Sequence, residues 1–260
     1  MKKLLVFSLA AALMACNGDT KKTESVAVAT AKNTDLIGQN LQGKVKELAE
    51  ANYNMDSTGK MKPDSSVTHF YFDEKGYQDR YTSSDSSGKV TMEQTLKHNP
   101  DGSFAEYVNM KNGKMSEKLV TEMKDSIYIG GKLYDSTGKQ IAYFDSLKQN
   151  EFGMVYEGKK HAMDGKVIAT WTSKYEGSHY VGGSSTDSTG KTDYSGTIKL
   201  NDKGDPIEET TTTLDKGVSK TETLTYKYEG TDDKGNWLQR TTYNDKGKAT
   251  KVVKRTITYY

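Results

Sequence analysis

The chain has 260 residues, of which 28% are charged and 33% hydrophobic, with 24 glycines, three prolines and a single cysteine. This low apolar fraction excludes a large, deeply buried α/β core, whereas 17 tyrosines, six phenylalanines and two tryptophans are too many aromatic residues for a disordered chain. The 37 basic and 35 acidic residues nearly cancel, so the charge gives no reason to expect nucleic acid as a partner.

The first residues have the pattern of an export signal. Two lysines precede an apolar run over residues 4–15, which is too short to span a bilayer. The segment Leu13-Met-Ala-Cys16 resembles the lipobox of bacterial lipoproteins. The resemblance implies that residues 1–15 are removed as a signal peptide and that the Cys16 thiol is acylated, which anchors the protein to a membrane. An ordinary cleavage site that happens to contain a cysteine is the alternative.

Residues 16–40 are expected to be the lipid-anchored cysteine and a flexible tether, because residues 17–33 are small, polar and unpatterned. Only one acidic residue, Asp19, closely follows Cys16, and two lysines come next. This favours an outer-membrane lipoprotein that faces the periplasm over one exposed at the cell surface. Residues 41–260 are expected to form a single domain.

Turn signals recur from residue 41 onward, as an Asp or Asn followed three residues later by Gly. The acidic or amide side chain accepts a backbone hydrogen bond two residues on, and the glycine adopts the left-handed conformation that closes a hairpin. The nine pairs are Asp56/Gly59, Asp73/Gly76, Asp85/Gly88, Asn99/Gly102, Asp135/Gly138, Asp187/Gly190, Asn201/Gly204, Asp232/Gly235 and Asn244/Gly247. Three of these turns share the sequence Asp-Ser-Thr-Gly-Lys.

The runs between the turns have seven to twelve residues and are rich in Thr, Val, Ile, Tyr and Phe. In residues 221–228, Leu224, Tyr226 and Tyr228 fall on one face, which is the period-two pattern of a half-buried strand. The sequence therefore predicts an all-β fold, an antiparallel meander of repeated β-hairpins that forms an extended, twisted sheet or an open β-solenoid. Residues 41–53 fit a helix or a strand about equally well.

Two family resemblances bear on this fold. The segments Leu41-Gln-Gly-Lys-Val-Lys46, Gly235-Asn-Trp237 and Arg255-Thr-Ile-Thr-Tyr-Tyr260 resemble Bacteroidota lipoproteins with YD-type, Rhs-like repeats. In the middle of the chain, Tyr-Glu-Gly or Tyr-Ser-Gly recurs every 19 residues from Tyr156, which looks like MORN-type hairpin repeats. The first resemblance implies a β-strand over 41–53. Both imply a stack of hairpins in which each unit contacts mainly its neighbours.

The sequence contains no recognisable catalytic or metal-binding pattern. Ser-x-x-Lys occurs four times, but every copy lies inside an Asp-x-x-Gly turn and lacks the partner motifs of a serine hydrolase. The four histidines have no ligand spacing, no Asp-rich turn matches a complete calcium loop, and no phosphate-binding loop is present. We therefore expect no catalytic residues, no metal, no cofactor and no enzymatic activity.

Aromatic residues are the remaining candidates for binding, because Trp and Tyr on a sheet face can stack on sugar rings or anchor a protein partner. The candidates are Trp171, Tyr175, Tyr180, Tyr226 and Trp237. The alternative is that they fill the thin core of the sheet itself.

The sequence thus suggests a non-enzymatic envelope lipoprotein that presents an extended β-sheet as an interaction surface for a protein or a glycan. The Rhs-like resemblance suggests an alternative, an immunity or antitoxin-type partner that blocks a secreted toxin. A glycan-active enzyme is a third hypothesis, which requires two carboxylates on facing strands.

Overall fold

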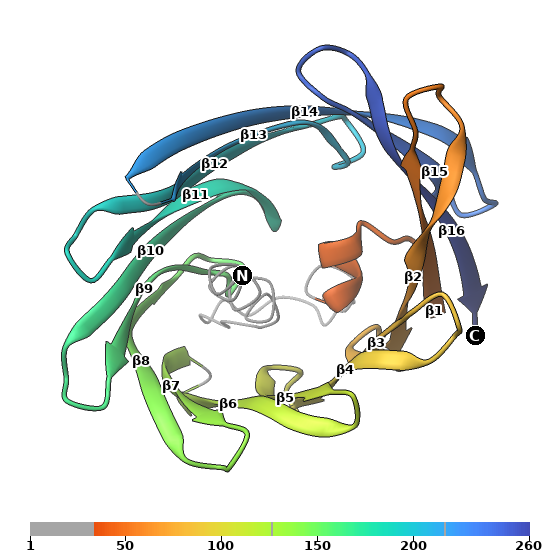
Figure 1. Ribbon diagram of the computed structural model, residues 1–260. Helices are drawn as coiled ribbons and strands as arrows, with labels where there is room; N and C mark the ends of the chain where they lie inside the picture. The colour runs from red at the N-terminus through yellow and green to blue at the C-terminus, as the bar shows by residue number, and fades with distance from the viewer. Residues whose placement is uncertain (1–33, 126, 216) are drawn as a thin grey trace.

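The protein is a closed β-barrel in the computed structural model, which describes residues 34–125, 127–215 and 217–260. The predicted signal peptide, Cys16 and most of the predicted tether lie outside the described residues. Each strand pairs antiparallel with its neighbours in the chain, and the ring surrounds a short 3-10 helix, η1 (Figure 1). Among the described residues, no helix is long and apolar enough to cross a membrane.

The elements in chain order are η1 (Asp35–Gln39), β1 (Val45–Met55), β2 (Met61–Phe72), β3 (Gln78–Ser84), β4 (Val90–His98), β5 (Phe104–Lys111), β6 (Lys114–Lys124), β7 (Ile127–Asp135), β8 (Gln140–Gln149), β9 (Val155–Ala162), β10 (Val167–Glu176), β11 (His179–Asp187), β12 (Thr192–Leu200), β13 (Pro206–Asp215), β14 (Val218–Thr231), β15 (Trp237–Tyr243) and β16 (Ala249–Tyr259).

The prediction of an extended sheet or an open solenoid is wrong, because the first strand pairs with the last. Val45 lies opposite Tyr259 and Asn54 opposite Lys251, so neither terminal strand has a free edge. Local patterns identify strands and turns but do not reveal whether the two ends of a meander meet. The choice of a strand over a helix for residues 41–53 is confirmed from Val45 onward.

The predicted turns are confirmed. In the first one, Asp56 Oδ1 accepts hydrogen bonds from the backbone amides of Thr58 (2.8 Å) and Lys60 (3.0 Å), and Gly59 has φ +80°. All nine predicted glycines have positive φ. A further turn of this kind, Asn150–Gly153, was not among the predicted ones.

The turns are sorted between the two ends of the barrel. Because consecutive strands run in opposite directions, every second turn lies at the same end. At one end, which we call the Gly-Lys rim, seven turns finish with Gly-Lys: 59–60, 88–89, 113–114, 138–139, 165–166, 190–191 and 247–248. At the other end, the η1 end, the glycine of each described turn is followed by another residue type: Tyr77, Ser103, Met154, Ser178, Asp205 or Asn236.

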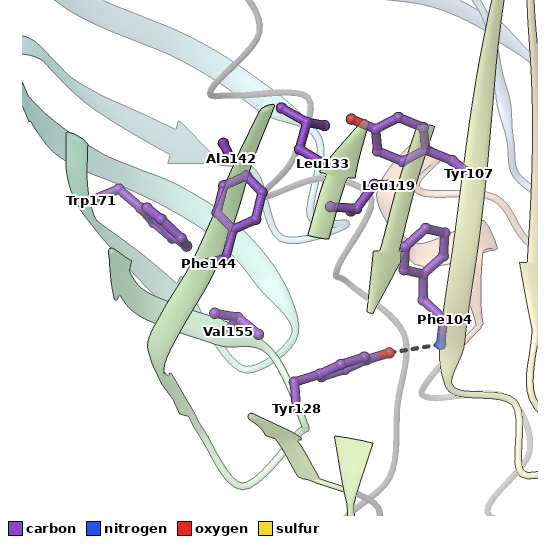
Figure 2. Packing of buried hydrophobic residues seen from close by; sticks show 9 residues of the cluster. All are labelled: Phe104, Tyr107, Leu119, Tyr128, Leu133, Ala142, Phe144, Val155 and Trp171. Atoms are coloured by element: carbon purple, nitrogen blue, oxygen red, sulfur yellow. Dashed lines mark hydrogen bonds between the residues drawn. The ribbon is translucent and has the colours of Figure 1, made fainter. Parts of the chain in front are cut away.

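Buried apolar side chains line the barrel wall in two clusters. Figure 2 shows the larger one, which consists of Phe104, Tyr107, Leu119, Tyr128, Leu133, Ala142, Phe144, Val155 and Trp171. Within it the backbone N–H of Phe104 donates to Tyr128 Oη at 2.6 Å. The smaller cluster, Leu41, Val45, Leu48 and Phe72, packs against Leu36 of η1. The barrel wall therefore carries two separate cores, one along β5–β10 and one at β1 and β2, beside the seam between β1 and β16.

The hydroxyl of Tyr128 is expected to contribute to stability. Tyr128→Phe should lower the free energy of unfolding by about 1–3 kcal/mol, because the buried N–H of Phe104 loses its acceptor. Urea denaturation measures the change, with Tyr134→Phe on the opposite face of β7 as the control. A loss no larger than that of the control would contradict the prediction.

The turn carboxyls should make stability depend on pH. The hydroxyls of Thr137 and Thr189, together with backbone amides, hold the pKa values of Asp135 and Asp187 below their usual range. Such a carboxyl stabilises the fold above its unfolded-state pKa, and this contribution is lost as the pH falls through its folded-state pKa.

A double variant, Asp135→Asn with Asp187→Asn, should keep both turns, since Asn caps the same kind of turn at Asn201. Its urea midpoint should fall less than that of the unsubstituted chain between neutral pH and a pH of about 3. Equal falls would contradict the assignment.

Candidate functional site

A cavity of about 240 Å³ lies inside the barrel at the η1 end, between η1 and β11–β16. We call it the lumenal pocket. Its polar and aromatic lining includes His179, Tyr180, Tyr228, Trp237, Arg240 and Arg255.

The helix η1 forms one wall of the lumenal pocket and is held by polar contacts with the barrel. Asn40, which ends η1 in the left-handed conformation, donates through Nδ2 to Asp205 Oδ1 (2.6 Å) and to the carbonyl of Lys203 (2.9 Å). Asp35 accepts a hydrogen bond from the amide of Gln78 (2.6 Å) and lies 3.0 Å from His98 Nε2. Residues 34–40, which the sequence pattern assigns to the tether, therefore help to build the pocket.

Arg255 is a cation with several partners in the pocket wall. Its Nε donates to Glu50 Oε1 (2.9 Å), across the seam from β16 to β1, and its Nη1 donates to the carbonyl of Gln39 (3.2 Å). Its guanidinium also covers the ring of Trp237, 3.5 Å from the centroid. Only 4% of the Arg255 side chain is exposed, so this residue ties the seam, η1 and Trp237 together.

Arg240 differs from Arg255 in having no carboxylate partner. Its guanidinium lies 5.1 Å from the ring centroid of Tyr226 and 5.4 Å from that of Trp237. Its Nε is buried, and no acceptor among the described residues is bonded to it. A buried hydrogen-bond donor without an acceptor is rare in folded proteins, because it loses its hydration and gains nothing in return.

Tyr180, which lines the same pocket, has a second unpartnered polar group. Its hydroxyl is buried without a hydrogen-bond partner among the described residues. Burial raises the pKa of Tyr180 above its usual range, so the hydroxyl keeps its proton and is a donor. Two buried donors without an acceptor in the described part of the chain thus belong to residues of β11 and β15 that line one cavity.

The structure gives the five predicted aromatic residues different roles. Trp171 packs edge-on against Phe144 (6.0 Å) in the larger cluster, and Trp237 is buried beneath Arg255. The hydroxyls of the other three residues distinguish them. Those of Tyr175 and Tyr226 are occupied by the carbonyl of Val155 (3.2 Å) and by Glu209 (2.7 Å), which leaves Tyr180 as the one with a free hydroxyl among the five.

Arg240 and Arg255 were not among the candidates predicted from the sequence, although composition held a signal for them. Only three of the 37 basic residues are arginine, at positions 80, 240 and 255, and two of these three line the lumenal pocket. The planar guanidinium stacks flat on aromatic rings and carries five donors in a fixed fork, whereas lysine carries a single ammonium group on a flexible stem. No three His, Asp, Glu or Cys side chains gather into a metal-binding group within the described part of the chain.

Removing the unpartnered hydroxyl should not destabilise the protein. Tyr180→Phe is expected to leave the free energy of unfolding unchanged or to raise it by up to about 1 kcal/mol, because a buried hydroxyl without a partner is removed. Tyr226→Phe is the matched comparison and should lower it, since the hydrogen bond to Glu209 is lost. Equal losses for the two variants in urea denaturation would show that Tyr180 has a partner within the fold.

The sequence matches no known protein-family profile and no curated protein. The fold is similar to that of a porin-like protein from Bacteroides uniformis ATCC 8492, with a TM-score of 0.56 and 12% identity over 84% of this chain and 98% of that one. A porin-like protein from Bacteroides vulgatus ATCC 8482 gives a TM-score of 0.42 and 11% identity over 83% of this chain and 98% of that one. TcdB2-TccC3 without its hypervariable C-terminal region gives 0.30 and 13% over 81% of this chain but 12% of that one. The first similarity shows a shared barrel fold with a Bacteroides protein, and no match assigns the chain to an Rhs-like or MORN-like family.

Proposed function

We propose that the protein is a non-enzymatic, lipid-anchored binding protein of the cell envelope that holds an oxygen-rich ligand of the glycan class in its lumenal pocket. The observation that carries this proposal is that two residues lining one cavity, Arg240 and Tyr180, each have a buried donor, Nε and Oη, without a partner among the described residues. Ligand oxygens that reach these two groups would supply the missing acceptors.

The chemistry of the pocket favours a hydroxyl-rich ligand over a simple anion. Asp205 lines the pocket, and Glu209 lies nearby in its bond to Tyr226, so Arg240 is not in a purely cationic environment. Sugar hydroxyls both donate and accept, and thus satisfy a guanidinium, a phenol and a carboxylate together. The cavity of about 240 Å³ is below the roughly 300–1,000 Å³ of pockets for drug-sized ligands, which suits a single sugar unit.

The outer face of the barrel supports attachment by an anchor. Leu119 packs in the larger cluster, so its neighbour Lys118 points to the opposite face, where it pairs with Glu106 (2.6 Å). Similar pairs are Lys132–Glu122 (2.5 Å), Lys148–Glu157 (2.9 Å) and Lys199–Glu208 (2.7 Å). Membrane-spanning barrels instead present an apolar band to lipid, where such charges are costly. The outer wall therefore suits water, and the concave inner wall replaces the predicted extended sheet as the proposed binding surface.

Replacing Arg240 tests the proposal directly. The unsubstituted chain should bind members of a panel of soluble neutral and acidic oligosaccharides in isothermal titration calorimetry. Arg240→Gln should weaken that binding by at least about tenfold, because one bond to a charged donor is lost.

Arg80→Gln is the matched control, since Arg80 also stacks on a tyrosine ring, that of Tyr71 (4.2 Å), but does not line the pocket. It removes the same charge and should leave binding unchanged. Equal weakening by both variants, or no binding to any member of the panel, would contradict the proposed function.

A further inference from the structure

We propose that the Gly-Lys rim is a second interaction surface, which contacts a membrane leaflet that contains anionic lipid headgroups. This surface is separate from the lumenal pocket and involves neither Arg240 nor Tyr180. A membrane contact at this end explains why one sequence motif is repeated at one end of the barrel only.

The lysines of the rim are exposed and unpaired. All seven side chains are exposed, at positions 60, 89, 114, 139, 166, 191 and 248. Within the described part of the chain, no carboxylate lies within 4 Å of any of their ammonium groups. By contrast, five lysines of the outer wall and Lys62 are paired with carboxylates at distances of 2.5–3.5 Å.

In four of these turns, the aspartate at the first position bonds to the backbone of its own turn. Asp85 Oδ1 accepts bonds from the amide (2.9 Å) and hydroxyl (2.6 Å) of Ser87 and from the amide of Lys89 (3.2 Å). Asp135 and Asp187 make the corresponding bonds in their turns. These carboxylates are half-buried and engaged, while the lysines are exposed. The carboxylates weaken the long-range electrostatic attraction between the rim and an anionic surface. The exposed lysines can still bind anionic groups at short range.

Apolar side chains accompany the lysines. Six of the ten exposed large hydrophobic residues among the described residues lie within four residues of a turn glycine of this rim: Met61, Val90, Met92, Ile141, Met163 and Val218, with exposed fractions from 42% to 70%. Exposed apolar groups interspersed with lysines are typical of surfaces that rest in the interfacial region of a bilayer.

The shape of the rim favours a flat partner. Successive turns at one end are two strands apart, which corresponds to roughly 10 Å around the ring. A linear polyanion would touch only a few of the seven lysines at a time, whereas a planar array of headgroups meets all of them together. The observations therefore favour a lipid surface over a nucleic acid or an acidic polysaccharide.

The proposed anchor is compatible with this orientation. The chain enters the barrel at the η1 end, and residues 17–33 can span at most roughly 60 Å. Strands of about ten residues are about 35 Å long, and because barrel strands are tilted, the wall is lower than this length. The lipid on Cys16 can therefore reach a membrane at either end. With the rim on the membrane, the lumenal pocket is at the end that faces away from it.

Lysine footprinting tests the orientation. The chain, expressed with its own N-terminus and processed by the host, is mixed with vesicles of phosphatidylcholine and phosphatidylglycerol and labelled with an amine-reactive reagent. The seven rim lysines should be labelled at least about threefold more slowly than with vesicles of phosphatidylcholine alone, and high salt should remove the difference. Lys44, Lys75, Lys203 and Lys234 at the η1 end are the internal control and should be labelled equally in both.

Two charge-matched variants separate the rim from a general effect of charge. Replacing Lys60, Lys89, Lys139 and Lys191 by Gln should abolish the slower labelling of the three remaining rim lysines on the anionic vesicles, since each lysine near an anionic surface adds a several-fold increase in binding. Replacing Lys44, Lys75, Lys203 and Lys234 by Gln removes the same charge and should have little effect. Equal effects of the two variants, protection of the η1-end lysines, or no difference between the two vesicle types would each overturn the proposal.

Discussion

The pairing of β1 with β16 closes the barrel and thereby encloses a lumen. Without it, the sixteen described strands would be an open ribbon with two free edges, and neither face would be enclosed. The seam is secured by more than backbone bonds, because the Glu50–Arg255 pair crosses it and Arg255 also holds the carbonyl of Gln39. Closure, the position of η1 and the burial of Trp237 are therefore linked through one side chain.

The two pocket arginines differ in their hydrogen-bond partners, and this difference distinguishes a structural role from the proposed role in ligand binding. Arg255 has a carboxylate, a carbonyl and an aromatic ring as partners, as expected of a charge that is buried for the fold. Arg240 has aromatic neighbours but no acceptor for its Nε among the described residues. An unpaired buried donor lowers stability by roughly 1–3 kcal/mol, and Tyr180 adds a second such group. A bound ligand that accepted these hydrogen bonds would offset the loss of stability. The proposed function therefore rests on Arg240 and Tyr180.

The two ends of the barrel differ in the residue that comes directly after each turn glycine. At the η1 end, residues such as Asp205 and Asn236 bond to Asn40 and to the backbone of Gln42, so the turns are used to hold the N-terminal segment. At the Gly-Lys rim the corresponding lysines make no ion pair with the described residues and lie beside exposed methionines and valines. One end is thus built as a binding site inside the protein, and the other is available for a contact outside it. With the Gly-Lys rim in contact with a membrane, the lumenal pocket at the opposite end would open to the surrounding compartment.

The sequence by itself determined the local structure, because a turn such as Asp56–Lys60 is specified by residues that are adjacent in the chain. It also determined that the runs between turns are strands, because apolar and polar residues alternate within a run and this pattern involves only residues two positions apart. Only the tertiary structure decided that Val45 meets Tyr259, that residues 34–40 fill part of the lumen, and that Arg240 and Tyr180 share a cavity. Each of these joins residues 60 to more than 200 positions apart, and no local preference encodes such a pairing. Closure depends on the summed twist and register of all the strands, which no single turn or strand reveals.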